Sequence, residues 1–175
     1  MDDYSSYQGA LEIFKKAGCL GSEENCIFGA VVARAKSATF KGAMAGKLAF
    51  GPVGFMVGHA IGRDIDSKVN KVYNYAHALI NVTEDGVGIM PLKGSVLSID
   101  PRKSKPAYDS FAFFQHQEIS KISIEKYMGL REQIKTLVIT LADKRKLNFY
   151  IKMTEKTLPY QEENMNRFVQ KYRIT

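Results

Sequence analysis

From residue 75 onward, hydrophobic and polar residues alternate along the chain in short runs. The clearest run is 147–153, in which every second residue is hydrophobic, and 76–82 has the same pattern. A period of two is typical of β-strands, because successive side chains point to opposite faces of a sheet. Glu84-Asp85-Gly86 predicts a hairpin turn, and the strand after it is expected to end at Pro91. Further strands are expected at 95–99, 110–115, 119–125 and 135–142, with a turn at 143–145.

The first seventy-five residues have a different pattern, in which hydrophobic residues recur at spacings of three and four. The segment 7–17 has one such stripe, which predicts an amphipathic helix that ends at Gly18. Ser22 then stands in a sequence typical of an N-cap, with Glu23 and Glu24 in the first turn that would follow. A second helix is therefore expected from this point, and its continuation would contain Ile27, Ala30, Val31 and Arg34.

A third helix is expected at the C-terminus. Pro159 stands near its start, where the missing N–H costs nothing, and acidic residues precede basic ones along the segment. Its hydrophobic stripe consists of Met165, Phe168, Val169 and Tyr172. The stripe has to be buried, and a half-open sheet is the obvious partner.

Gly42–Asp64 is rich in glycine, and its glycines recur at a spacing of four. They are Gly42, Gly46, Gly54, Gly58 and Gly62. This glycine-zipper spacing would put the glycines on one helix face, where another backbone can approach closely, although Gly51-Pro52 interrupts the pattern. The segment either packs as tight helices on the β-domain or on another copy, or contacts the membrane surface. The mean hydropathy of −0.20 favours packing.

The chain is thus expected to consist of a helical Gly/Ala-rich segment, 1–70, and a β-domain with a C-terminal helix, 71–175. The stretches YAHALINVTEDGVGIMPL, KTLVITLADKRKLNFYIKM and LPYQEENMNRFVQKYR resemble bacterial pleckstrin-homology-like domains. The resemblance implies an α+β fold, in which a partly open antiparallel β-barrel of about seven strands is capped by the C-terminal α-helix. It also implies a binding or assembly module. Phosphoinositide-binding members carry basic residues in the first hairpin loop, whereas Glu84-Asp85-Gly86 would repel a phosphate.

The 175-residue chain carries a net charge of +7, which suits an anionic partner but is also an ordinary means of staying soluble. We expect no enzyme, cofactor or metal site. The segment Gly42–Leu48 resembles a P-loop but is one residue short and has no hydroxyl for magnesium. His59, His77 and His116 have no second ligand at metal-binding spacing, and the two cysteines, Cys19 and Cys26, are expected to be reduced thiols.

Two basic clusters are the candidate binding residues. They are Arg102, Lys103 and Lys105 in one loop and Lys144, Arg145 and Lys146 in a hairpin turn. If the loops converge, they could hold an anionic phospholipid headgroup, and otherwise they are solvated turns. Nucleic acid is disfavoured, because the aromatic residues alternate into core positions and are not available for stacking. We therefore expect a cytoplasmic, non-catalytic interaction or assembly module that binds protein or itself, at the inner membrane face if lipid contributes.

Overall fold

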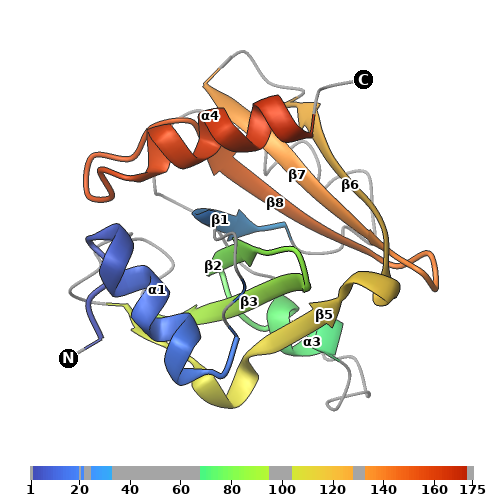
Figure 1. The fold of residues 1–175 in the computed structure, drawn as a ribbon, viewed down its shortest axis with the longest axis horizontal. Helices are drawn as coiled ribbons and strands as arrows, with labels where there is room; N and C mark the ends of the chain where they lie inside the picture. Colours follow the sequence, from blue (N-terminus) through green and yellow to red (C-terminus); the bar gives the residue numbers. More distant parts are fainter. Residues whose placement is uncertain are drawn as a thin grey trace.

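The computed structural model describes residues 2–19, 21, 25–32, 68–94, 104–127 and 133–172 (Figure 1). The strands are β1 (Asn25–Val31), β2 (His77–Val82), β3 (Gly86–Lys93), β4 (Lys105–Pro106), β5 (Ala112–Gln115), β6 (Ile119–Lys126), β7 (Ile134–Leu141) and β8 (Lys146–Lys152). The helices are α1 (Tyr7–Lys16), α3 (Lys68–Tyr73) and α4 (Gln161–Lys171), with short 3-10 helices η1 (Tyr108–Ser110) and η2 (His116–Glu118).

In the described part of the chain, eight strands form one open antiparallel sheet. Their order is β4-β3-β2-β1-β8-β7-β6, and β5 pairs with β3 beside β4. The predicted α+β class, an antiparallel sheet with a C-terminal helix, is confirmed, with eight strands where about seven were expected. Closure of the sheet into a barrel stays a prediction.

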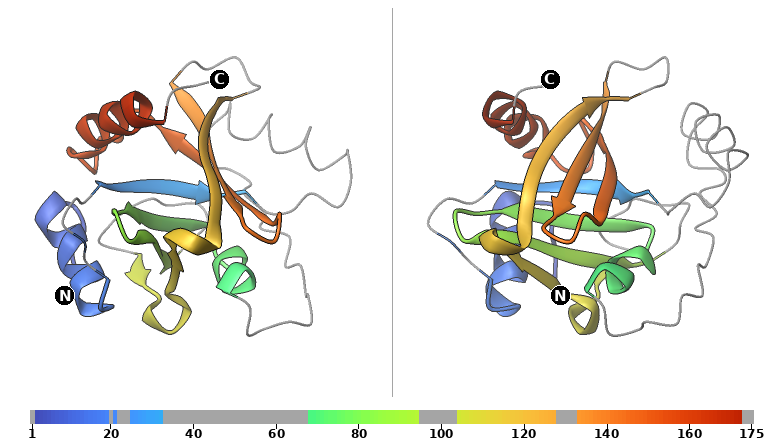
Figure 2. Two further views of the ribbon diagram at one scale, coloured as in Figure 1. Left: turned by 45° about the vertical axis from the view of Figure 1, so that its right-hand side comes forward. Right: turned by 90° about the vertical axis from the view of Figure 1, so that its right-hand side faces the viewer.

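Strand β1 joins the two halves of the sheet, which are β2 to β5 on one side and β6 to β8 on the other (Figure 2). It pairs with β2 along most of its length, but with β8 only through Ala30 and Val31. The helix expected at this place is therefore wrong. Ile27 and Val31 are spaced by four, which fits both a helix and a strand, and both side chains lie in the core. Cys26 and Phe28 are buried on the opposite face, so burial on both faces decides for the strand.

The edge of β1 that β8 leaves uncovered is hydrogen-bonded by side chains of α4. The Gln161 amide accepts from the Phe28 N–H (2.9 Å) and donates to the Phe28 carbonyl (3.0 Å) and to the Lys152 carbonyl (3.0 Å). The Asn164 amide donates to the Cys26 carbonyl at 2.7 Å. Both amide side chains are fully buried, so they replace a neighbouring strand and fix the start of α4 on the sheet.

The first hydrophobic core lies between the two halves of the sheet. It contains the inner side chains of both halves, among them Ile80, Leu137 and Phe149. The predicted stripe of α4 is confirmed: Met165 and Phe168 are buried in this core, and Val169 and Tyr172 pack against it half-buried. Helix α3 contributes the buried side chains Val69 and Val72.

A second core lies on the other face of β1, β2 and β3, where α1 covers the sheet. Its members include Ile13 and Phe14 of α1, together with Leu79 and Met90 of the sheet. Helix α1 is confirmed, and Gly18 follows it with a φ of +74°. Because β2 and β3 pack against a core on each face, nearly all of their residues are buried.

Strand β3 continues through Pro91, so the expected end at this residue is wrong. The Thr83 N–H donates to the Gly86 carbonyl, and the alternation of an antiparallel pair then directs the Pro91 backbone away from β2. There Pro91 stands between the positions that pair with β5 and β4, and its carbonyl accepts from the Ala107 N–H at 2.8 Å. A proline is tolerated here because no ladder bond to β2 needs its missing donor.

The strands predicted at 76–82, 119–125, 135–142 and 147–153 are confirmed, as are the hairpin at Gly86 and the turn at 143–145. The strand predicted at 110–115 begins later, since η1 occupies its first residue. The strand predicted at 95–99 and the glycine-zipper residues lie outside the described residues. Among the residues that are described, no helix is long and apolar enough to span a membrane.

Candidate functional site

The basic turn between β7 and β8 is well defined. Lys144 adopts a φ of 69°, and the Asp143 carboxylate accepts from the Arg145 backbone N–H at 3.0 Å. The Arg145 guanidinium bonds the same carboxylate at 2.5 Å. These contacts lower the pKa of Asp143, with the backbone N–H as the largest cause. The turn thus neutralises its own arginine, whereas Lys144 and Lys146 are exposed without an ion-pair partner in the described part of the chain.

The second basic cluster is only partly described. Lys105 is exposed on β4, where it pairs across the ladder with Lys93, whose ammonium bonds Asp109 at 3.0 Å. Arg102 and Lys103 lie outside the described residues. Among the residues that the structure covers, no hydrogen bond or ion pair joins Lys105 to the β7–β8 turn. Convergence of the two basic clusters therefore stays a prediction.

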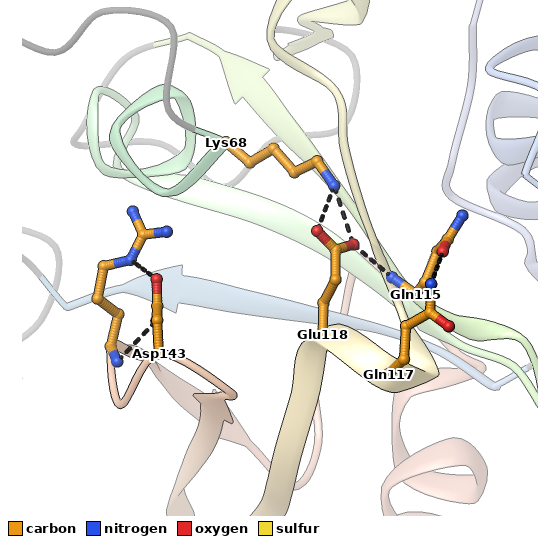
Figure 3. A network of polar contacts seen from close by, with 6 residues as sticks. Lys68, Gln115, Gln117, Glu118 and Asp143 are labelled. Carbon is orange, nitrogen blue, oxygen red and sulfur yellow. Dashed lines mark hydrogen bonds and ion pairs between the residues drawn. The ribbon is translucent and has the colours of Figure 1, made fainter.

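An open cleft of about 510 Å³ lies beside the β7–β8 turn, between α3, η2 and the ends of β5 and β7. Figure 3 shows two ion pairs among the residues that line it. In one pair, the Lys68 ammonium bonds the Glu118 carboxylate at 2.8 Å and lies 5.5 Å from the centre of the Phe114 ring. The other pair is that of Asp143 and Arg145. Leu141 and Ala142 also line the cleft.

The charges of the cleft are balanced within the protein. Lys68 and the Gln115 backbone N–H both bond the Glu118 carboxylate and lower its pKa, with Lys68 the larger cause. The carboxylates of Glu118 and Asp143 are therefore ionised at neutral pH and are poorly suited to donate a proton. The cleft can accept and donate hydrogen bonds, but each carboxylate competes with an incoming anion for its cation.

Three of the remaining reactive side chains, His77, Cys19 and Cys26, are buried. His77 is buried and stacks on Phe28, with ring centroids 5.4 Å apart. Burial is the main cause that lowers its pKa to about 4, and Lys152 adds to it, so His77 is neutral at physiological pH. Cys19 and Cys26 are buried thiols. No cluster of metal-ligating side chains occurs in the described ranges.

The outer edge of β6 is a candidate binding surface that sequence reasoning missed. Only β7 pairs with β6 among the described strands. The Leu141 N–H donates to the Arg145 carbonyl, so Leu141 and Arg145 form a hydrogen-bonded pair. The backbone N–H and C=O groups of odd-numbered residues of β7 therefore point toward β8, and those of even-numbered residues point toward β6. Since Val138 pairs with Ser123, the backbone of Ser123 faces β7, and the N–H and C=O groups of Ile122 and Ile124 point outward.

Comparison with known proteins adds no identification. No family model matches the chain, and no curated protein matches it. The resemblance to bacterial pleckstrin-homology-like domains therefore stays a prediction.

Proposed function

We propose that the protein is a non-catalytic interaction module that binds a protein strand, from a partner or from another copy of itself, along the outer edge of β6. The observation that carries this proposal is that β6 pairs with β7 alone among the described strands, because an edge with unpaired N–H and C=O groups forms a template for a further strand. At eight residues, β6 is longer than β4 and β5 at the opposite end of the sheet. The edge thus offers length for a specific pairing.

The module would be a cytoplasmic pleckstrin-homology-like domain. Supporting this fold identity are the element order, an antiparallel sheet followed by one helix, and the packing of α4 across the gap between β1 and β8. A rigid sheet with a helix fixed on it by buried hydrogen bonds is a suitable frame for presenting an edge.

The test is chemical cross-linking of exposed amines, with the full chain alone and in an extract of its source. Lys121 and Lys126 lie on β6, and both are exposed. We expect intermolecular cross-links at these two lysines in excess of those at Lys105 and Lys156, which are exposed elsewhere. Intermolecular cross-links that avoid β6, or their absence, would contradict the proposal.

Peripheral binding to anionic phospholipid is the alternative function, and it is favoured by the exposure of Lys144 and Lys146 without an ion-pair partner among the described residues. Co-sedimentation of the full chain with anionic and zwitterionic vesicles tests it at low and high salt. Binding that requires anionic lipid, is released by salt and is lost in Lys144→Glu/Lys146→Glu would establish this alternative. If the protein sediments to the same extent with and without vesicles, this alternative is rejected.

A further inference from the structure

The sequence of β6 is self-complementary in charge about its centre. Lys121-Ile122-Ser123-Ile124-Glu125 carries a cation on one side of Ser123 and an anion at the same distance on the other. If a second copy of β6 pairs antiparallel about Ser123, Lys121 of each copy stands opposite Glu125 of the other, and Ile122 stands opposite Ile124. We infer that the occupant of the β6 edge is a second copy of this chain, related by a two-fold axis through Ser123.

The backbone geometry of β6 fits this pairing. The outward N–H and C=O groups belong to Ile122 and Ile124, the residues that would face each other across the interface. Each such pair can exchange both of its backbone hydrogen bonds. Ser123 would meet its own counterpart in a non-hydrogen-bonded pair, where the Cα atoms of opposite residues are closest.

The side chains fit as well. Lys121, Ser123 and Glu125 lie on one face of the sheet, because their partners on β7 alternate with the core residues Leu137 and Ile139. A two-fold axis perpendicular to the sheet keeps this face common to both copies. Neither Lys121 nor Glu125 has an ion-pair partner in the described part of the chain, so both charges are available to the second copy.

Three other registers are disfavoured by the same residues, and registers centred on Ile122 or Ile124 would leave Lys121 and Glu125 without an opposite charge across the interface. Parallel pairing in register would put each charge opposite its like, and antiparallel pairing centred on Lys121 or on Glu125 would put that residue opposite itself. At its start, β6 is irregular, since its register with β7 shifts between Ile119 and Lys121. This bulge confines regular pairing to the segment after it, which is the self-complementary one.

The inference rests on the proposed function and names its partner, and a charge exchange tests it. Sedimentation velocity of the full chain over a wide concentration range should show a monomer–dimer equilibrium. In Lys121→Glu or Glu125→Lys, like charges would face each other at both symmetry-related places, and dimer dissociation constants should rise roughly tenfold or more. The double variant should return to within about threefold of the original value. Lys126→Glu is the matched control, because Lys126 would face Ser120, and its effect should be smaller than that of either single variant.

Disulfide trapping provides a second measurement that does not depend on affinity. Ser123→Cys places a thiol on the proposed two-fold axis, in a cross-strand position whose Cα separation suits a disulfide. Mild oxidation should give a covalent dimer for Ser123→Cys and far less for Glu125→Cys, which would face Lys121. Circular dichroism of every variant checks that the fold is retained.

The outcomes separate this inference from the proposed function. A strict monomer at all concentrations, without Ser123→Cys trapping, overturns self-pairing, whereas cross-links from Lys121 or Lys126 to another protein would keep the interaction module. If the charge substitutions leave the dimer dissociation constant unchanged, the proposed β6 register is overturned, although self-association stands.

Discussion

The buried amide of Gln161 offers the sharpest test of how the sheet is held together. We consider Gln161→Leu, which keeps the size of the side chain and removes its hydrogen bonds. The Phe28 N–H then loses its acceptor, and the Phe28 and Lys152 carbonyls lose their donor. Because β8 pairs with β1 only through Ala30 and Val31, no strand can replace the lost bonds of Phe28.

The magnitude follows from the two backbone groups of Phe28. A buried polar group without a partner costs about 1–3 kcal/mol, and Lys152 is left out of the sum because it is an exposed residue, so the two Phe28 groups together lower the free energy of unfolding by about 2–6 kcal/mol. This is a large share of the roughly 5–15 kcal/mol of a typical domain. For a chain of this size each kcal/mol lowers Tm by about 2–4 °C, so Tm should fall by about 4–24 °C.

Urea unfolding followed by circular dichroism measures the loss. The matched control is Gln170→Leu, the same substitution at an exposed position of α4, which should stay within about 0.5 kcal/mol of the original protein. If Gln161→Leu is no more destabilising than Gln170→Leu, the amide contacts do not stabilise the junction of β1 and α4, and our account of it is refuted.

Three further predictions concern single residues. The folded pKa of His77 is about 4 against an ordinary 6.5, so the unfolded state binds more protons between these values, and about 3 kcal/mol of stability should be lost as pH falls from 6.5 to 4. Urea midpoints should show this slope in the original protein and in His116→Gln, but not in His77→Phe. Lys144→Gly should increase the free energy of unfolding by about 0.5–1 kcal/mol, because the φ of 69° suits glycine. The urea midpoint should therefore rise, and an unchanged or lower midpoint would contradict this. Gly86→Ala should cost about 2 kcal/mol or more, because its Cβ would lie 2.1 Å from the Phe114 carbonyl oxygen at a φ of +154°, and a neutral effect on Tm would count against it.

The sequence predicts elements well where one periodicity is unambiguous. The strand at 147–153 alternates strictly and the stripe of α4 keeps helical spacing, and both are confirmed. It fails at β1, where Ile27 and Val31 satisfy both periods and glycine and alanine give no contrast between faces. Only the second core beneath α1, built from residues distant in the chain, decides for a strand.

The candidate site was less predictable than the fold. The β7–β8 turn is visible in the sequence as Asp143-Lys144-Arg145, but its ion pair depends on the turn conformation. The edge position of β6 depends on strand order, which local patterns do not encode, because β5 leaves β3 through η2 before β6 pairs with β7. One signal was present: the charge symmetry about Ser123 can be read from the sequence once the strand is known to be an edge.

Residue-resolved amide hydrogen exchange at several protein concentrations tests the central claim most directly. The amides of Ile122 and Ile124 point outward from β6, whereas the amide of Ser123 faces β7. Our account predicts that protection of Ile122 and Ile124 rises with protein concentration while that of Ser123 stays constant. Fast exchange of Ile122 and Ile124 at every concentration, in a protein that nevertheless associates, would contradict binding at the edge of β6.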